Sequence, residues 1–341
     1  PQNSVTKVQD FQDVYSGINM GDCLLFIDTL NIAFDIDVKN YTQRSISAPE
    51  NESVIKGPQE GFVENFRTNT SIISKLVREE QTNKQTGIEV INDFRNRIYL
   101  DNVSYSYNEK NEAIKNVSFT FEKNKKYIVV GNSGGGKSTL LGLINGSLEG
   151  FSGSITIDGK RIEEIDLKSL NRLISIIHQN IFLFDDTIRN NITLFDDTVT
   201  EKYLEKVIQM VGLEDLINKK GINGKVGENG EFLSGGEKQR IAIARALVKK
   251  TKILLLDEAT AALDLENSFN IENMILQIPD LTLIVVSHKF VKENLCKYDN
   301  IIAMKDGQLK EVGTFQDLIS RKGYFYSLFS IVYGDDQRAG L

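Results

Sequence analysis

Residues 131–139 read "GNSGGGKST" and fit the pattern G-x-x-x-x-G-K-[ST]. The glycines allow backbone conformations in which successive N–H groups can point at phosphate oxygens. Lys137 supplies a positive charge for the β- and γ-phosphates, and the Ser138 hydroxyl is a ligand for Mg²⁺. A helix that begins at Lys137 would add the positive end of its dipole. The stretch therefore predicts a phosphate-binding loop between a strand and a helix, which is an α/β arrangement.

The flanking residues decide whether this pattern is a chance match in a flexible loop. The segment "KKYIVVG" (125–131) predicts a short buried strand that runs into the loop, and "KSTLLGLINGS" (137–147) predicts a helix. Two further apolar strands, at 252–257 and 281–287, are typical of a parallel sheet covered on both faces. This context favours a true phosphate-binding loop. Other strands are expected at 97–107 and 116–122, a hairpin around Asp158-Gly159, and helices near 186–193 and 200–212.

Two carboxylates follow the apolar strand "ILLLD" (253–257). Asp257 ends this strand at the carboxyl edge of the predicted sheet, where it could hold Mg²⁺ through water. Glu258 would then face the water that attacks the γ-phosphate. On its own, a pair of carboxylates after a strand is more often a solvated strand end. The phosphate-binding loop upstream favours the catalytic interpretation instead.

The segment "FLSGGEKQRIAIARAL" (232–247) identifies a family. With the loop and the carboxylates, it resembles the nucleotide-binding domain of ATP-binding cassette (ABC) transporters. Leu233–Glu237 stands for the family's signature motif, whose fifth residue is more often Gln. A helix that begins near Gly235 presents free N–H groups, and Ser234 adds a hydroxyl donor, so an anion can bind there.

Further family elements occur in the expected order. Tyr107 matches the aromatic residue that stacks on adenine, although a strand aromatic buried in the core is the alternative. Gln179 matches the Q-loop glutamine, and Ala262-Leu263-Asp264 matches the D-loop. His288 matches the switch histidine that contacts the γ-phosphate, with a structural histidine as the alternative. His178 is interpreted only as a neighbour of Gln179.

The resemblance implies a P-loop NTPase cassette over 97–333, with a mixed-sheet core, an antiparallel β-subdomain and a helical signature subdomain. Two chains would sandwich two molecules of ATP with Mg²⁺, head to tail. The catalytic residues would be Glu258, His288, Gln179 and Lys137, and the Mg²⁺ ligands Ser138, Gln179 and Asp257. The nucleotide would contact Tyr107, Asn132, Ser133, Gly134, Gly135, Gly136, Lys137, Ser138, Thr139, Ser234, Gly235, Gly236 and Asp264.

Two stretches resemble the exporter type of cassette. These are "HQNIFLFDDTIRNNI" (178–192), around the Q-loop, and "VGENG" (226–230), the X-loop with Glu228 in the acidic position. In exporters both regions contact the transmembrane domains. The resemblance implies such partners, and a place at the cytoplasmic face of the bacterial plasma membrane.

Residues 1–78 differ in character from the cassette. The loop "RSISAPENE" (44–52) and the segment "GPQEGFVENFRTN" (57–69) resemble the A-subunit family of spore germinant receptors. A small, truncated α+β segment is expected there, with a strand pair within 20–38 and a helical stripe at 62–77. A linker is expected at 79–96, and a tail at 334–341. An unrelated α+β appendage is the alternative. The two resemblances leave two functions open: a transport ATPase, and a chimeric chain whose N-terminal part senses germinants or acts as a scaffold.

Composition sets limits on these functions. The net charge is −7, with 40 basic and 47 acidic residues. Neither part of the chain is basic, which argues against nucleic acid as a partner. No apolar run approaches the roughly 18 residues that span a bilayer. Cys23 and Cys296 fit no metal-ligand spacing and are expected to be unpaired thiols.

Overall fold

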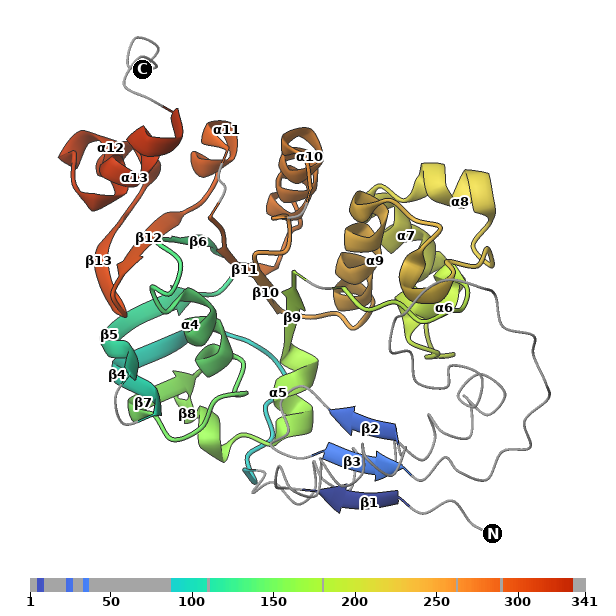
Figure 1. Cartoon of the computed structure of the whole chain (residues 1–341), viewed down its shortest axis with the longest axis horizontal. Coiled ribbons are helices and arrows are strands. Elements are labelled where there is room, and N and C mark those ends of the chain that lie inside the picture. The colour runs from blue at the N-terminus through green and yellow to red at the C-terminus, as the bar shows by residue number, and fades with distance from the viewer. Residues whose placement is uncertain are drawn as a thin grey trace, which may run out of the picture. The chain divides into compact units, whose positions relative to one another are not determined.

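The computed structural model describes residues 87–108, 111–179, 181–261, 263–288 and 291–333, and three strands nearer the N-terminus. The chain divides into two compact units, Pro1–Gln85 and Thr86–Leu341. Figure 1 shows both units coloured along the chain. Each unit is described separately below.

The described part of the first unit is a three-stranded antiparallel sheet in the order β1-β3-β2. Its strands are β1 (Val5–Val8), β2 (Cys23–Phe26) and β3 (Ala33–Ile36). The strand pair predicted within 20–38 is confirmed, whereas β1 was missed because its polar and apolar residues give only a short pattern. The helical stripe expected at 62–77 lies outside the described residues.

The second unit is built on a six-stranded sheet in the order β13-β12-β6-β11-β10-β9. Neighbouring strands are parallel except for the antiparallel pair β12–β13, so the sheet is mixed, as expected. Its strands are β6 (Lys126–Val130), β9 (Ile174–His178), β10 (Ile253–Asp257), β11 (Thr282–Val286), β12 (Asn300–Lys305) and β13 (Gln308–Gly313).

Both faces of this sheet are buried. Along β10, Leu254 and Leu256 belong to one hydrophobic cluster, and Ile253 and Leu255 belong to the other. Successive side chains of a strand point to opposite faces, so a central strand covered on both sides is apolar throughout. This explains why the continuous apolar runs in the sequence are strands.

An antiparallel sheet in the order β5-β4-β7-β8 packs against one face. Its strands are β4 (Arg97–Asn108), β5 (Asn111–Glu122), β7 (Ser152–Ile157) and β8 (Lys160–Arg161). The hairpin between β7 and β8 turns at Asp158-Gly159, as predicted, and both residues have positive φ (52° and 86°).

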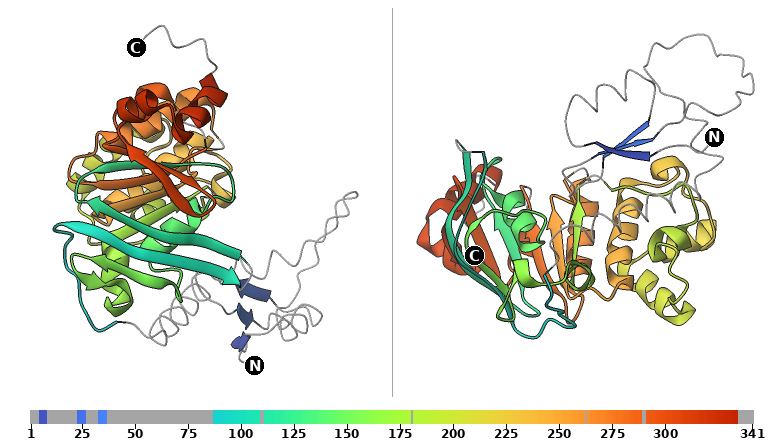
Figure 2. Two further views of the ribbon diagram at one scale, coloured as in Figure 1. Left: turned by 90° about the vertical axis from the view of Figure 1, so that its left-hand side faces the viewer. Right: turned by 90° about the horizontal axis from the view of Figure 1, so that it is seen from below.

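Helices complete the second unit. Figure 2 shows α6 to α9 at one end of this unit and the antiparallel sheet at the other. The three-part architecture expected of an ABC cassette is therefore confirmed. None of the helices that the structure describes is long and apolar enough to cross a bilayer. The helices are α4 (Lys137–Ile144), α5 (Leu167–Leu173), α6 (Ile188–Thr193), α7 (Glu201–Val211), α8 (Glu214–Lys220), α9 (Gly235–Val248), α10 (Leu265–Leu276), α11 (Lys292–Leu295), α12 (Phe315–Arg321) and α13 (Tyr324–Tyr333).

Residues 87–96 are part of the predicted linker, but they belong to the second unit and pack against the rest of it. The Glu89 N–H donates to the Glu164 carbonyl at 2.9 Å, and the Glu89 carbonyl accepts from Asp166 N–H at 2.8 Å. Ile91 and Phe94 are buried in the cluster under the antiparallel sheet. The polar residues around these two side chains hide this contact in the sequence.

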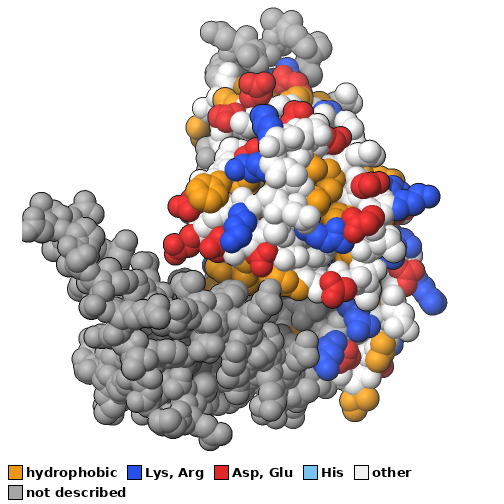
Figure 3. All heavy atoms as spheres, turned by 90° about the vertical axis from the view of Figure 1, so that its right-hand side faces the viewer, with side chains coloured by type: hydrophobic (Ala, Val, Ile, Leu, Met, Phe, Trp, Pro, Cys, Tyr) orange, Lys and Arg blue, Asp and Glu red, His pale blue; other side chains and the backbone are white. Residues whose placement is uncertain are grey.

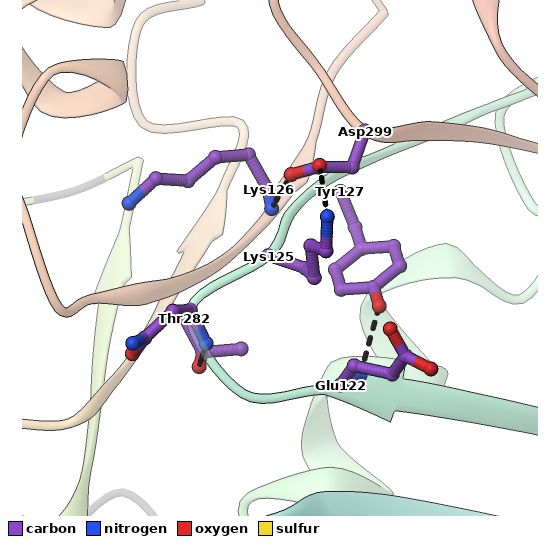
Figure 4. Close-up of polar contacts among 7 residues, drawn as sticks. Glu122, Lys125, Lys126, Tyr127, Thr282 and Asp299 are labelled. Atoms are coloured by element: carbon purple, nitrogen blue, oxygen red, sulfur yellow. Dashed lines mark hydrogen bonds and ion pairs between the residues drawn. The ribbon is translucent and has the colours of Figure 1, made fainter.

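The start of β6 carries a buried lysine (Figure 4). Asp299 accepts from the Lys126 N–H and from Lys125 Nζ, both at 2.8 Å, and the Lys126 side chain extends away from them. Lys126 Nζ donates to the carbonyl oxygens of Ile278 and Leu281 at 3.0 and 2.6 Å. Burial of the ammonium group lowers the pKa of Lys126 to about 8, against the opposing effect of Asp299.

This lowered pKa predicts a pH-dependent stability. Between about pH 8 and the usual lysine pKa, the unfolded chain binds more protons than the folded one, so stability rises with pH. The penalty for burying the charge is complete below about pH 8 and disappears near pH 10.5. We expect the free energy of unfolding of the parent to rise across this pH range. This rise should exceed that of Lys126→Met by up to about 3 kcal/mol. Urea unfolding of both proteins at several pH values measures this difference. A difference between the two proteins that stays constant with pH would contradict the lowered pKa.

Candidate functional site

The phosphate-binding loop connects β6 to α4. At Gly136 φ is 92°, and a Cβ there would lie 2.4 Å from the Ala113 carbonyl oxygen, so only glycine fits. Lys137 Nζ folds back over the loop and donates to the carbonyl oxygens of Gly131 and Asn132 at 3.0 and 2.8 Å. Burial lowers the pKa of Lys137, while the charges of Glu258 and Asp257 oppose this effect. The lysine is thus held at the start of α4, facing two acidic residues.

Ser138 and Asp257 meet although they lie 119 positions apart. The Ser138 hydroxyl donates to Asp257 Oδ1 at 2.8 Å. Hydroxyl and carboxylate oxygens are the hard ligands that Mg²⁺ prefers, so this pair fits the ion. His178, which the sequence analysis set aside, lies beside them, with Nδ1 3.9 Å from Asp257 Oδ2. The register of β9 and β10 pairs His178 with Asp257, and only a knowledge of strand order could have predicted this contact.

Glu258 and His288 form the second pair. Glu258 Oε1 lies 2.5 Å from His288 Nε2. The two residues follow neighbouring parallel strands, β10 and β11, whose ends meet at the same sheet edge. Glu258 has a positive φ of 51°, which is uncommon for a residue with a side chain and recurs in turns and at active sites. The structural alternative for His288 is not favoured, because the ring is exposed and paired with this carboxylate.

Lys137, Ser138, Glu258 and His288 line one pocket of about 450 Å³, whereas Asp257 lies outside its lining. Tyr107 stands at its rim, 61% exposed, with its hydroxyl 3.1 Å from Thr139 Oγ1. This exposure excludes the alternative of a buried core aromatic. The predicted residues that line the pocket are Tyr107, Ser133, Gly134, Gly136, Lys137, Ser138, Thr139, Glu258 and His288. Sequence reasoning missed Glu112, Ala113, Lys115, Asp306 and Gly307, which β5 and the β12–β13 turn bring to the pocket.

The other predicted residues lie outside the pocket lining among the residues described. Asn132 and Gly135 belong to the loop itself, where Gly135 N–H donates to the Asn132 carbonyl at 3.1 Å. Gln179 follows β9 and is exposed. Asp264 caps α10 by accepting from the Asn267 N–H at 2.8 Å, which lowers the pKa of this aspartate.

The signature residues form the N-terminus of α9. Ser234 Oγ accepts from the Glu237 N–H at 3.3 Å, and Glu237 Oε2 accepts from the Ser234 N–H at 2.7 Å, which is a capping box. The Ser234 hydroxyl also donates to Glu237 Oε2 at 2.9 Å. Ser234 is exposed, and a Cβ on Gly235 would lie 2.9 Å from Leu263 Cδ2. Gly236 is buried behind them. The signature and the D-loop therefore share a surface, and the Ser234 hydroxyl must leave Glu237 before it can donate to a phosphate.

Arg245 ties α9 to the segment that follows Gln179. Its guanidinium donates to the Asn191 and Phe182 carbonyl oxygens, both at 2.6 Å, and to Asn191 Oδ1 at 2.7 Å. Burial lowers the pKa of Arg245 to about 10. The helical end of the unit mixes acidic and basic side chains, with hydrophobic ones in separate patches (Figure 3). The large exposed hydrophobic residues of this part of the chain include Phe182, Leu194, Phe195 and Phe232.

Two family models match the chain. Residues 114–261 match the model described as ABC transporter, and residues 1–91 match that of the Bacillus/Clostridium GerA spore germination protein. The second match continues past the expected boundary at residue 78 and includes Ile91, whose side chain is buried in the second unit.

Proteins with similar sequences are named for export. The chain is 35% identical over 257 residues to an ATP-dependent lipid A-core flippase of Vibrio parahaemolyticus, covering 74% of this chain and 44% of the flippase. It is 36% identical over 265 residues to a Staphylococcus aureus protein whose name describes a multidrug export ATP-binding/permease protein, covering 76% and 45%.

Among solved structures, a bacterial Atm1-family ABC exporter with ATP bound has a TM-score of 0.68 at 30% identity, covering 81% of this chain and 49% of the exporter chain. The chain thus spans about half the length of the relatives it matches. Residues 114–261 therefore match the ABC transporter family, and residues 1–91 match the GerA spore germination family.

Proposed function

We propose that residues 97–333 bind MgATP and hydrolyse it to ADP and phosphate, as the motor of an exporter. The observation that carries this proposal is the Glu258–His288 pair, which faces the same pocket as Lys137. ATP hydrolysis needs a base, a group that contacts the γ-phosphate and a group that binds the phosphates. Three separate segments of the chain bring these groups to one cavity.

Each side chain in the pocket would then have a specific task. Lys137 neutralises charge on the β- and γ-phosphates, helped by N–H groups of the loop Asn132, Ser133, Gly134, Gly135, Gly136, Ser138 and Thr139. Tyr107 offers its exposed ring to adenine. Glu258 orients the attacking water, and His288 holds the γ-phosphate.

Ser138, Asp257 and Gln179 would hold Mg²⁺. Such an ion would supply positive charge beside the phosphates. The Ser138–Asp257 contact already brings two of these oxygen donors together, and Gln179 extends from the adjacent strand end.

A second copy of the chain is proposed to complete the site. Ser234, Gly235 and Asp264 lie outside the pocket and are exposed at the starts of α9 and α10, and Gly236 is buried behind the first two. An exposed helix N-terminus with a hydroxyl donor attracts an anion, which in a head-to-tail dimer would be the ATP bound by the other copy.

Transmembrane domains are the second proposed partner. The exposed side chains Phe182, Phe195 and Phe232 lie near the Q-loop and the X-loop in the sequence, and Glu228 of the X-loop is also exposed. Exposed aromatic side chains of this kind could pack against helices of transmembrane domains at the cytoplasmic face of a bacterial plasma membrane. Membrane helices, and not this cassette, would choose the cargo.

The match of residues 1–91 to the germination family supports a second candidate function. The N-terminal part would sense germinants or act as a scaffold, and the cassette would be gated by ATP or silent. The two candidates differ in whether the chain turns over ATP and whether the N-terminal part affects that turnover.

We expect the chain to hydrolyse ATP, and a variant that begins at Gly87 to keep its ATP affinity and turnover within about twofold, well below the tenfold change that corresponds to about 1.4 kcal/mol. The reason is that the truncation keeps the hydrogen bonds of Glu89, which tie this end of the second unit to Glu164 and Asp166. Steady-state ATPase assays of both proteins measure this. A folded truncated chain that loses tenfold or more would show that the two parts are coupled. A full chain that binds ATP without turnover would favour the scaffold function.

A further inference from the structure

A buried carboxylate joins α10 to the segment after β11, outside the nucleotide pocket. Glu272 on α10 is 8% exposed. The Tyr298 hydroxyl donates to its Oε1, and Asn294 Nδ2 donates to its Oε2 at 3.1 Å. Both donors are themselves buried. A buried carboxylate is costly unless its oxygens are hydrogen-bonded, so this arrangement binds the two segments in one geometry.

On the α10 side, the contact continues to the turn that carries Glu258. Ser268 lies one helical turn before Glu272 on the same face of α10. Its hydroxyl donates to the Thr260 carbonyl oxygen at 3.1 Å. The Ala261 N–H in turn donates to the Glu258 carbonyl oxygen at 2.9 Å. The position of α10 therefore fixes the backbone at Glu258.

On the other side, the contact continues to His288. The N–H groups of Asn294 and Leu295 donate to the Val291 carbonyl oxygen at 2.9 and 3.1 Å. Val291 follows His288 by three positions, and consecutive Cα atoms are only about 3.8 Å apart. Val291, the N-cap residue of α11, can therefore lie no more than about 11 Å from His288. Figure 1 shows α10 and α11 side by side above the sheet.

The two segments thus meet in the pocket, through Glu258 and His288, and also behind it, through Glu272. We propose that Glu272 is a positioning residue for the proposed ATP hydrolysis, because its hydrogen bonds with Tyr298 and Asn294 hold the turns of Glu258 and His288 at the separation at which these two side chains meet. This proposal rests on the proposed function for its effect on turnover, but its effect on His288 can be measured without nucleotide.

Three variants separate this role from general stability. Glu272→Ala removes the contact. Glu272→Gln can restore it, because its amide oxygen can accept from Asn294 while its NH₂ donates to the Tyr298 oxygen. Asn273→Ala is the matched control, since it removes the bond from Lys297 Nζ to Asn273 Oδ1 on α10 at 2.7 Å and leaves the bond from Lys297 Nζ to Asn294 Oδ1 at 3.1 Å in place. The contact that is removed joins the same two segments at the surface.

We expect Glu272→Ala to lower kcat about tenfold, equivalent to about 1.4 kcal/mol, with the dissociation constant for ATP within about twofold. Glu272→Gln and Asn273→Ala are expected to stay within about threefold of the parent in kcat. All assays are run where urea unfolding shows each variant to be folded. A folded Glu272→Ala variant with parental kcat would overturn the proposal, as would equal losses in all three variants.

A second readout does not depend on turnover. The chain has two histidines, so the NMR ring signals of His288 can be assigned by comparison with His178→Asn. In nucleotide-free protein, we expect these signals to move in Glu272→Ala and to keep their parental positions in Asn273→Ala. Unchanged signals in Glu272→Ala would refute the positioning role even if the parent hydrolyses ATP. A parent without turnover but with the expected signal shift would instead refute the proposed function alone.

Discussion

Glu258→Gln is expected to bind MgATP with nearly parental affinity and to lose at least about 100-fold in turnover, the lower end of what general base catalysis contributes. Binding depends mainly on the phosphate-binding loop and Tyr107, which this change leaves intact. Glutamine has the size of the Glu258 side chain, whose Oε1 lies 2.5 Å from His288 Nε2. It cannot, however, accept a proton from the attacking water. ATP that is not hydrolysed should then hold two chains together.

Size-exclusion chromatography with and without ATP, together with a steady-state ATPase assay, measures both effects. Glu205→Gln is a suitable control, because it makes the same change at an exposed carboxylate of α7. A Glu258→Gln chain that hydrolyses ATP at the parental rate would show that another group orients the water. A chain that binds ATP but stays monomeric would argue against ATP as the link between two copies.

Local pattern predicted the elements that carry the site. The apolar run Lys126–Val130 followed by glycines specified β6, the loop and the start of α4, because strand, turn and helix each have their own residue preferences there. The continuous apolar runs that became β10 and β11 were predicted for the same reason.

Other features depend on long-range pairing, which sequence periodicity does not contain. Glu112 and Asp306 reach the pocket only because β5 and the β12–β13 turn pack beside the phosphate-binding loop. The contact of Glu272 with Tyr298 joins residues 26 positions apart, and neither stands in a recognisable motif. The short helices α5 and α8 were also missed, since seven residues hold too few apolar positions to define a period.

Ser234→Arg and Lys137→Ala are each expected to abolish hydrolysis in a dimer of identical chains. Ser234 is exposed, so an arginine there should not disturb folding. It would place a cation at the positive end of the α9 dipole and remove the hydroxyl that is proposed to contact phosphate. Lys137→Ala removes the ammonium group that lies over the phosphate-binding loop.

Mixing the two inactive variants should restore part of the activity. In a mixed dimer, one site has both defects, whereas the other combines the intact loop of one chain with the intact signature of the second. Random pairing makes half of the dimers mixed, so the expected recovery is at most about a quarter of parental activity. ATPase assays over a range of mixing ratios measure this recovery, which should peak at equal amounts.

The control is a chain with both substitutions. Mixed with Ser234→Arg or with Lys137→Ala, it leaves no site intact, so no activity should return. Recovery in the first mixture but not in these two would mean that each ATP is bound by the loop of one chain and the signature of the other. If mixed dimers form, as shown by affinity tags of two kinds, but remain inactive, then either the sites are not composite or both must be intact before one can turn over. A single intact site that binds ATP without hydrolysing it would identify the second case, because the loop and the signature would then still meet across the dimer.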